Sequence, residues 1–238
     1  MNLAFILHWK IFFEYFPTKR MLNGFGNPFR QRLTKPNANI LDVGCGQSPF
    51  ILDLIEEDFT FTAFDSDESQ LKYLENRISE INPSYSQKVN FQKGIFPSQE
   101  IHYEEYDAII FNNLFHFLEF DKLIDIFSEI NNKIKSGAYI FITVHSDKNV
   151  EMKKSNDYFK HLFSVEDIEC LFPKEKYEYC EFSSGEFIIT DYEKTFYSEW
   201  IKQVNKNQPE PVIKHQIQDY LAKNSKYFYI ETLLKKLM

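Results

Sequence analysis

The feature that most constrains the fold is a regular alternation of short apolar runs and amphipathic segments from residue 39 to residue 144, at a spacing of about 25 residues. Each apolar run is rich in aromatic and β-branched residues and ends at a turn signal, which indicates a buried strand. The predicted strands cover 39–43, 59–64, 89–91, 106–111 and 139–144, and the predicted helices cover 50–57, 68–81 and 121–134. This alternation predicts a parallel sheet with helices on both faces.

Ligands of such sheets bind beyond the carboxyl ends of the strands. The sequence between the first two predicted strands carries the clearest binding signal. Two of the chain's seven glycines follow the first strand in Asp42-Val-Gly-Cys-Gly46, where glycine lets the backbone turn sharply and approach a ligand. Ser48 and Pro49 then predict the start of a helix. Asp65 ends the second strand, where a carboxylate can accept hydrogen bonds from both hydroxyls of a ribose.

Four motifs in this region resemble those of the class I S-adenosylmethionine-dependent methyltransferases. The first is Ile40-Leu-Asp-Val-Gly-Cys-Gly46, and the others cover 64–71, 106–118 and 130–142, so that the resemblance spans about residues 38–145. It implies an α/β fold with a Rossmann-like, seven-stranded, mostly parallel sheet and helices on both faces. It also implies S-adenosyl-L-methionine as cofactor and S-adenosyl-L-homocysteine as product.

The resemblance also implies roles for residues at the strand exits. Asp42, Gly44 and Gly46 would border the methionine part of the cofactor, Asp65 would hold the ribose, and residues 112–115 would line the methyl-transfer pocket. The expected cofactor-binding residues are Asp42, Gly44, Cys45, Gly46, Asp65, Ser66, Ile95, Phe96, Asn112 and Asn113. The expected substrate-binding residues are Tyr15, Phe115 and His116, and no metal ligand is expected.

Two histidines are candidate catalytic residues because of their positions. His116 and His145 follow the fourth and fifth predicted strands, where either could take a proton from the acceptor or orient it. A hydrogen-bonded structural role is the more common one for a histidine, and it remains the alternative for both residues.

The chain departs from the family pattern at two places. Ser48 stands where the family has its third glycine, and the segment Lys93-Gly94-Ile95 lacks the acid that commonly contacts adenine, so a backbone contact would have to replace it. A nicotinamide-binding fold is the nearest rival, because it shares the strand, the glycines and the acid. That fold usually has G-x-G-x-x-G, and here Pro49 occupies the last glycine position.

Charge is distributed unevenly along the chain. Residues 1–38 carry a net charge of +5, residues 39–197 one of −16 and residues 198–238 one of +3, which sum to the total of −8. The sign changes indicate terminal additions to an acidic core. We predict an N-terminal helical lid at 1–37, a methyltransferase core at 38–195 and a C-terminal helical appendage at 196–238, with the two ends closing over the strand exits. Their basic character indicates a small-molecule acceptor that is possibly anionic, although basic arms packing on an acidic body explain it equally well.

Beyond the alternating core, the sequence predicts further elements. A helix is expected at 164–171, and a hairpin of 176–182 with 186–192, turning at Ser183-Ser-Gly185, would complete the sheet. Helices are expected at 197–204, 212–222 and 227–237, and a turn at 25–29.

Composition excludes several classes of protein. A mean hydropathy of −0.41 and the lack of a long apolar run argue against a membrane-spanning helix. Three cysteines without C-x-x-C spacing argue against a disulfide scaffold or a zinc module. The apolar N-terminus lacks the cationic start and the small-residue cleavage site of a signal peptide, so a cytoplasmic protein is expected. The acidic centre disfavours nucleic acid as a partner.

The function that the sequence predicts is methyl transfer to an oxygen or nitrogen nucleophile of a small molecule. Its alternatives are an RNA or protein methyltransferase, and a non-catalytic module that binds S-adenosylmethionine on the same fold. The sequence does not predict an oligomeric state.

Overall fold

The structure is a computed structural model that describes residues 7–8, 10–12, 26–149 and 159–237. The chain divides into two compact units, which are described separately. The larger unit comprises residues 24–185 and 228–238. The smaller unit contains residues 186–227 together with the described part of the N-terminus.

The larger unit is built on a seven-stranded sheet with the strand order β3-β2-β1-β4-β5-β7-β6. The first five strands are parallel, and β7 runs antiparallel to β5. The strands are β1 (Ala38–Val43), β2 (Phe59–Asp65), β3 (Val89–Lys93), β4 (Ala108–Asn112), β5 (Tyr139–His145), β6 (Tyr177–Ile188) and β7 (Lys226–Lys236). The predicted α/β, Rossmann-like fold is confirmed.

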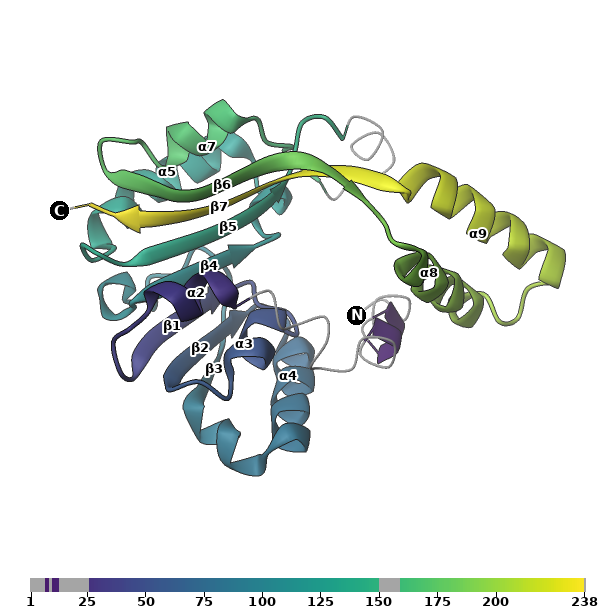
Figure 1. Ribbon diagram of the computed structural model, residues 1–238, viewed down its shortest axis with the longest axis horizontal. Helices are drawn as coiled ribbons and strands as arrows, with labels where there is room; N and C mark the ends of the chain where they lie inside the picture. Colours follow the sequence, from purple (N-terminus) through teal and green to yellow (C-terminus); the bar gives the residue numbers. More distant parts are fainter. Residues whose placement is uncertain (1–6, 9, 13–25, 150–158, 238) are drawn as a thin grey trace. The chain divides into compact units, whose positions relative to one another are not determined.

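Helices cover both faces of this sheet (Figure 1). They are α2 (Asn27–Arg32), α3 (Pro49–Leu54), α4 (Glu68–Ile81), α5 (Phe120–Lys133) and α7 (Val165–Leu171), with short 3-10 helices at Pro83–Lys88, Tyr103–Glu105 and Phe115–Phe117. The predicted helix starts are confirmed: the Ser48 hydroxyl accepts a hydrogen bond from the Ile51 N–H at 3.0 Å, and Asp67 caps α4.

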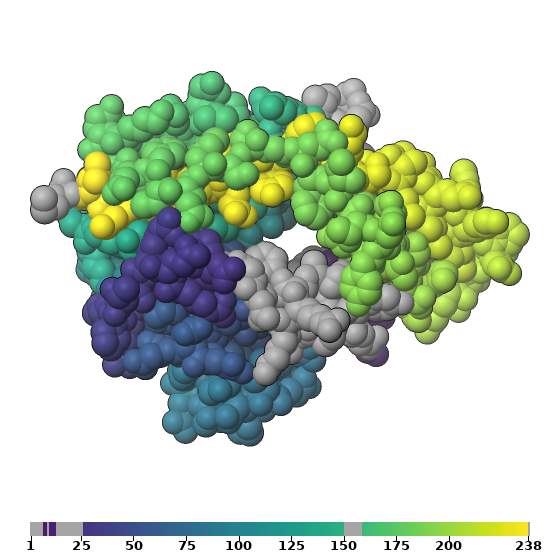
Figure 2. All heavy atoms as spheres, in the orientation of Figure 1, coloured from purple at the N-terminus to yellow at the C-terminus, as the bar shows by residue number. Residues whose placement is uncertain are grey.

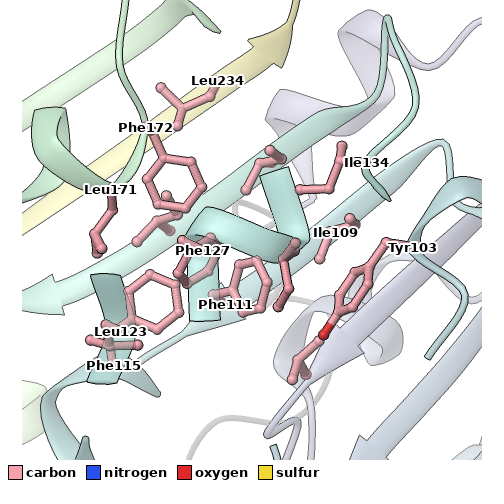
Figure 3. Packing of buried hydrophobic residues seen from close by; sticks show 14 of the residues in the cluster. Tyr103, Ile109, Phe111, Phe115, Leu123, Phe127, Ile134, Leu171, Phe172 and Leu234 are labelled. Carbon is pink, nitrogen blue, oxygen red and sulfur yellow. The ribbon is translucent and has the colours of Figure 1, made fainter. Parts of the chain in front are cut away.

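The main hydrophobic core lies between the sheet and the pair α5 and α7. Figure 3 shows rings of β4, of the following 3-10 helix and of α5 and its neighbours packed together. The ring of Phe127 lies 5.5 Å from that of Phe111, 5.2 Å from that of Phe115 and 4.8 Å from that of Phe172, measured between centroids. All four side chains are at most 1% exposed, so this cluster fixes how α5 docks on the sheet.

One predicted helix is wrong, because residues 227–237 form most of strand β7. The apolar side chains Tyr227, Ile230 and Leu234 recur at helical spacing, which misled the prediction. The same segment is rich in aromatic and β-branched residues, and its backbone pairs along the whole of β5, from Tyr139 with Lys235 to His145 with Tyr229. Pairing with a strand distant in sequence outweighs the local periodicity.

The predicted hairpin is also wrong. Residues 177–188 form one continuous strand, β6, instead of two strands turning at Gly185. Its neighbour in the sheet is β7 from the far end of the chain, so the seventh strand of the predicted sheet comes from the C-terminus.

Helix α2 replaces the turn predicted at 25–29, and charged contacts hold it to α3 and β6. The buried Asp53 carboxylate accepts a hydrogen bond from the Gly26 N–H at 2.7 Å and pairs with Arg30 at 3.1 Å. At the other end of α2, Arg32 pairs with Glu181 of β6 at 2.6 Å. Figure 2 shows the atoms of α2 (dark purple) against those of β6 (green).

The smaller unit contains the helices α8 (Asp191–Val204) and α9 (Glu210–Asn224). They include the predicted helices 197–204 and 212–222, and α8 begins six residues earlier than predicted. A helical stretch at residues 7–8 and 10–12 packs Ile11 against Phe196 of α8. The His8 ring lies among aromatic rings, and burial lowers its pKa to about 4. In the part of the chain that the structure describes, no helix is long and apolar enough to span a bilayer. The predicted closure of both ends over the strand exits stays a prediction.

Candidate functional site

The glycine loop leaves β1 in a conformation that side chains rarely adopt. Gly44 has a φ of +66° and Gly46 one of +53°. The N–H groups of Gly44 and Cys45 both donate to the Phe64 carbonyl of β2, at 2.8 and 3.1 Å. A Cβ on Gly44 would lie 2.7 Å from Cδ1 of Leu114, so both the turn and the close approach of the β4 exit require glycine.

Asp65 binds the same loop from the end of β2. One carboxylate oxygen accepts a hydrogen bond from the Gly46 N–H at 2.8 Å, and the other accepts one from the Asp67 N–H at 2.8 Å. The side chain is only half-buried, so lone pairs remain on its oxygens for a further donor. The structure therefore brings together the two parts of the predicted cofactor site.

Only one of the two carboxylate oxygens of Asp42 has a hydrogen-bond partner among the described residues. The side chain is 1% exposed, and Oδ2 accepts a hydrogen bond from the Ser48 hydroxyl. Among the described residues, Oδ1 has no hydrogen-bond partner. Burial raises the Asp42 pKa to about 7, with the hydrogen bond from Ser48 opposing the shift and the negative charge of Asp65 adding a smaller part of it.

This arrangement fits S-adenosylmethionine. The methionine end of the cofactor carries an ammonium group, and a buried carboxylate oxygen without a partner gains most from such a donor. The half-buried Asp65 is suited to the ribose hydroxyls, and the turn at Gly44 and Gly46 leaves room for the backbone to approach the cofactor.

Replacing Asp42 with asparagine is expected to weaken cofactor binding by about 10–100-fold above pH ~8, because a charge-assisted hydrogen bond is lost. Wild-type affinity should rise as the pH rises through about 7, where the Asp42 carboxyl loses its proton, and the variant should lack this rise. Calorimetric titration of the cofactor across pH measures both effects. A pH dependence shared by the two proteins would contradict the assignment.

Stability of the free protein supplies an independent check on Asp42. Because the folded pKa lies above the unfolded value of 3.8, the folded state binds more protons between these limits. The wild type's unfolding free energy should therefore fall as the pH rises towards about 7, and the asparagine variant should lose this contribution.

The other expected cofactor residues differ in accessibility. Ser66 and Asn113 are exposed, Ile95 is 76% exposed, and Asn112 is half-buried at the end of β4. Phe96 and Cys45 are 8% exposed, and burial raises the Cys45 thiol pKa well above its usual value, which makes it unreactive. Asn113 has a φ of +54°, and its N–H donates to the Thr143 carbonyl at 2.9 Å, which aligns the exits of β4 and β5.

The two candidate catalytic histidines lie together. The ring centroids of His116 and His145 are 4.8 Å apart, and both rings contact Phe159. Burial, with a smaller effect of His145, lowers the His116 pKa to about 3, and burial lowers the His145 pKa to about 4. Both imidazoles are therefore neutral at pH 7 and suited to orienting an acceptor by hydrogen bonding, rather than to holding its proton.

Two expected substrate-binding residues have different outcomes. Phe115 was expected to line the methyl-transfer pocket, but its side chain is 0% exposed and belongs to the hydrophobic core. The 3-10 helix that follows β4 turns this ring inward, whereas the adjacent Phe117 is 49% exposed. Tyr15 lies outside the described residues, and its role stays a prediction.

Sequence reasoning missed polar side chains on β5 and β7. Thr143 pairs in register with Glu231, and His145 with Tyr229, so these residues follow Asn112 across the same edge of the sheet. Glu231 was overlooked because its segment was expected to be helical. The aromatic and β-branched composition of 227–233 was the signal that could have revealed the strand.

No metal site accompanies this edge among the described residues. Groups of three or more His, Cys, Asp or Glu side chains placed to hold a metal ion are absent from the described residues. A cavity of about 490 Å³ is lined by Asn39, Thr60 and Val89, among others, near the amino ends of β1, β2 and β3. It lies at the opposite end of these strands from the glycine loop.

Comparisons with known proteins agree with this geometry. A family model described as "Methyltransferase domain" matches residues 40–137. No curated protein sequence gives a significant match.

Solved structures share the fold at low sequence identity. A protein provisionally described as a sarcosine dimethylglycine methyltransferase from Galdieria sulphuraria has a TM-score of 0.66 and 13% identity, over 92% of this chain and 86% of that one. Geranyl diphosphate methyltransferase in complex with SAM has a TM-score of 0.59 and 10% identity, over 90% and 85%. The [4+2]-cyclase SpnF has a TM-score of 0.62 and 13% identity, over 91% and 82%.

At these identities the structural likeness establishes the fold alone. Residues 40–137 thus match a methyltransferase domain, and they lie in a Rossmann-like fold that this chain shares with methyltransferases of known structure.

Proposed function

We propose that the protein transfers the methyl group of S-adenosyl-L-methionine to an oxygen or nitrogen atom of a small molecule. The single observation that carries the cofactor part is the buried Asp42 carboxylate, whose Oδ1 has no hydrogen-bond partner among the described residues, beside the loop that Asp65 binds. S-adenosyl-L-homocysteine would be the product. When bound, the cofactor supplies an electrophilic sulfonium methyl group.

The protein's own part in this proposal is binding and orientation. Asp42 holds the methionine part of the cofactor and Asp65 its ribose, and Asn112 faces the acceptor from the end of β4. Neutral His116 and His145 hold the acceptor by hydrogen bonding. Bringing donor and acceptor into line can supply several kcal/mol of the barrier reduction.

A small acceptor is supported by two observations. The centre of the chain is acidic, with a net charge of −16 over residues 39–197, which repels a phosphate backbone. The Galdieria sulphuraria neighbour is described as acting on sarcosine and dimethylglycine, which are small amines. The free thiols of Cys45, Cys170 and Cys180 are consistent with action in the cytoplasm.

The alternatives are an RNA or protein methyltransferase and a non-catalytic binding module. The neighbour described as a [4+2]-cyclase indicates that this fold also serves reactions other than methyl transfer, so methyl transfer itself has to be tested.

Incubation with methyl-labelled S-adenosylmethionine and separate pools of metabolites, RNA and protein tests the function. We expect label in the metabolite pool alone. Label in RNA or protein would move the function to a macromolecular substrate. Cofactor binding with no labelled product in any pool would indicate a binding module, and the absence of cofactor binding would overturn the whole proposal.

A further inference from the structure

Three polar side chains form a row across neighbouring strands at the cofactor edge. Asn112 of β4 pairs in register with Thr143 of β5, which pairs in register with Glu231 of β7. Residues paired in register point to the same face of a sheet. All three side chains are half-buried, so they lie between the packed interior and solvent.

The position of this row places it beside the cofactor loop. Asp42 pairs with Ile110, so Gly44, two residues further on, comes level with Asn112. Along β5 on the same face, the pair before Thr143 and Glu231 is Phe141 with Leu233, and both side chains are buried. The pair after them is His145 with Tyr229, where β5 ends. An acceptor that faces the cofactor at the exit of β4 therefore meets Thr143 and Glu231 next.

Glu231 is an acid without a basic partner among the described residues. Of the two arginines on neighbouring α2, Arg32 instead pairs with Glu181 at 2.6 Å and Arg30 with Asp53 at 3.1 Å. Burial raises the Glu231 pKa, and the negative charge of Glu181 raises it further. A partly buried carboxylate in this setting is stabilised by a cation that arrives with a ligand.

Aromatic rings stand at the same edge and suit the same kind of ligand. His145 lies two residues beyond Thr143 on the same face of β5, and its ring centroid is 5.2 Å from that of Phe159. The His116 ring contacts both of these rings. The rings of Phe117 and Phe159 are 5.7 Å apart. The faces of such rings attract organic cations.

We propose that the methyl acceptor is an amine and that the Glu231 carboxylate binds its cationic ammonium group next to the aromatic rings of the β4 and β5 exits. This proposal rests on the proposed function and narrows its substrate class. It departs from the anionic acceptor that the basic chain ends indicate. After a proton leaves the ammonium group for solvent, the nitrogen lone pair forms the N–C bond while the S–C bond breaks. The sulfur keeps the electron pair as a neutral thioether, and the product leaves as the methylated ammonium ion, so that one proton is released in total.

Binding of paired amines and acids to the full chain saturated with S-adenosylhomocysteine tests the proposal without turnover. The pairs are tyramine with para-hydroxyphenylacetate, and butylamine with butyrate. We expect the wild type to bind each amine at least about tenfold more tightly than the matched acid, because only the amine can donate a charge-assisted hydrogen bond to the Glu231 carboxylate. In the Glu231→Gln variant, the ratio of amine affinity to acid affinity should fall by at least about tenfold. The affinity for S-adenosylhomocysteine should stay within about twofold of the wild type.

Glu178→Gln is the matched control, because it removes an exposed acid of β6 without touching the row. It should keep the preference for amines. Equal or tighter binding of the acids by the wild type, no binding of either amine, or an unchanged preference in Glu231→Gln would each overturn the amine proposal while leaving the proposed function intact. Failure of the wild type to bind S-adenosylhomocysteine would overturn both.

Discussion

Replacing Phe115 with alanine is expected to lower the free energy of unfolding by about 3–5 kcal/mol. The side chain is 0% exposed, and its ring centroid lies 5.0 Å from that of Phe111 and 5.2 Å from that of Phe127. Truncation leaves a cavity among rings that are themselves held by α5 and the sheet, so the surroundings can collapse only in part. Urea unfolding followed by far-ultraviolet circular dichroism measures the loss as a lower midpoint at an unchanged slope.

The neighbouring Phe117 supplies the control for this prediction. It lies in the same 3-10 helix and is 49% exposed, so Phe117→Ala should change stability by less than about 1 kcal/mol. A Phe115→Ala variant with wild-type stability and a raised KM for the acceptor would show that the ring faces the substrate, as the sequence alone predicts. The conservative Phe115→Leu should recover more than half of the lost stability.

Replacing Asp65 with alanine is expected to weaken the affinity for S-adenosylmethionine by at least about 100-fold. The carboxylate accepts hydrogen bonds from the N–H groups of Gly46 and Asp67, so its removal frees the cofactor loop as well as the predicted ribose contacts. Two charge-assisted hydrogen bonds at about 1.5–3 kcal/mol each account for a loss of this size. Calorimetric titration measures it directly.

Glu68→Gln is the matched control for Asp65, because it removes a carboxylate three residues away. Glu68 is exposed and pairs with exposed Lys93 at 3.0 Å, and such a surface pair contributes little. The control should bind the cofactor within about twofold of the wild type. If Asp65→Ala retained wild-type affinity, Asp65 would be a structural residue of the loop and the site assignment would fail.

Sequence reasoning succeeded where the deciding interactions are local. The strand that ends at Val43, the turn at Gly44, the cap at Ser48 and the helix from Glu68 to Ile81 each depend on a few adjacent residues. Turn conformation, capping and first-turn proline act within one or two turns of the chain, so their signals are complete in the sequence. The predicted site at the exits of β1 and β2 is built from these local elements, so its position could be predicted from the sequence.

The predictions that failed concern pairing and orientation between distant parts of the chain. Residues 227–237 carry apolar side chains at a spacing that fits a helix, and only the hydrogen bonds offered by β5 make them a strand. Likewise, whether Phe115 or Phe117 turns inward depends on the space that α5 and α7 leave beside β4. Periodicity within a segment cannot report the partner that the segment will meet.

Local sequence thus settles the turn at Gly44 and which backbone and carboxylate groups stand at the exits of β1 and β2. Tertiary packing alone decides that β7 enters the sheet beside β5, and hence that Glu231 joins Asn112 and Thr143 in one row. The physical reason is that a glycine turn or a helix cap is stabilised by its immediate neighbours. A strand register is stabilised only by the partner strand, and the face on which each side chain falls follows from that register.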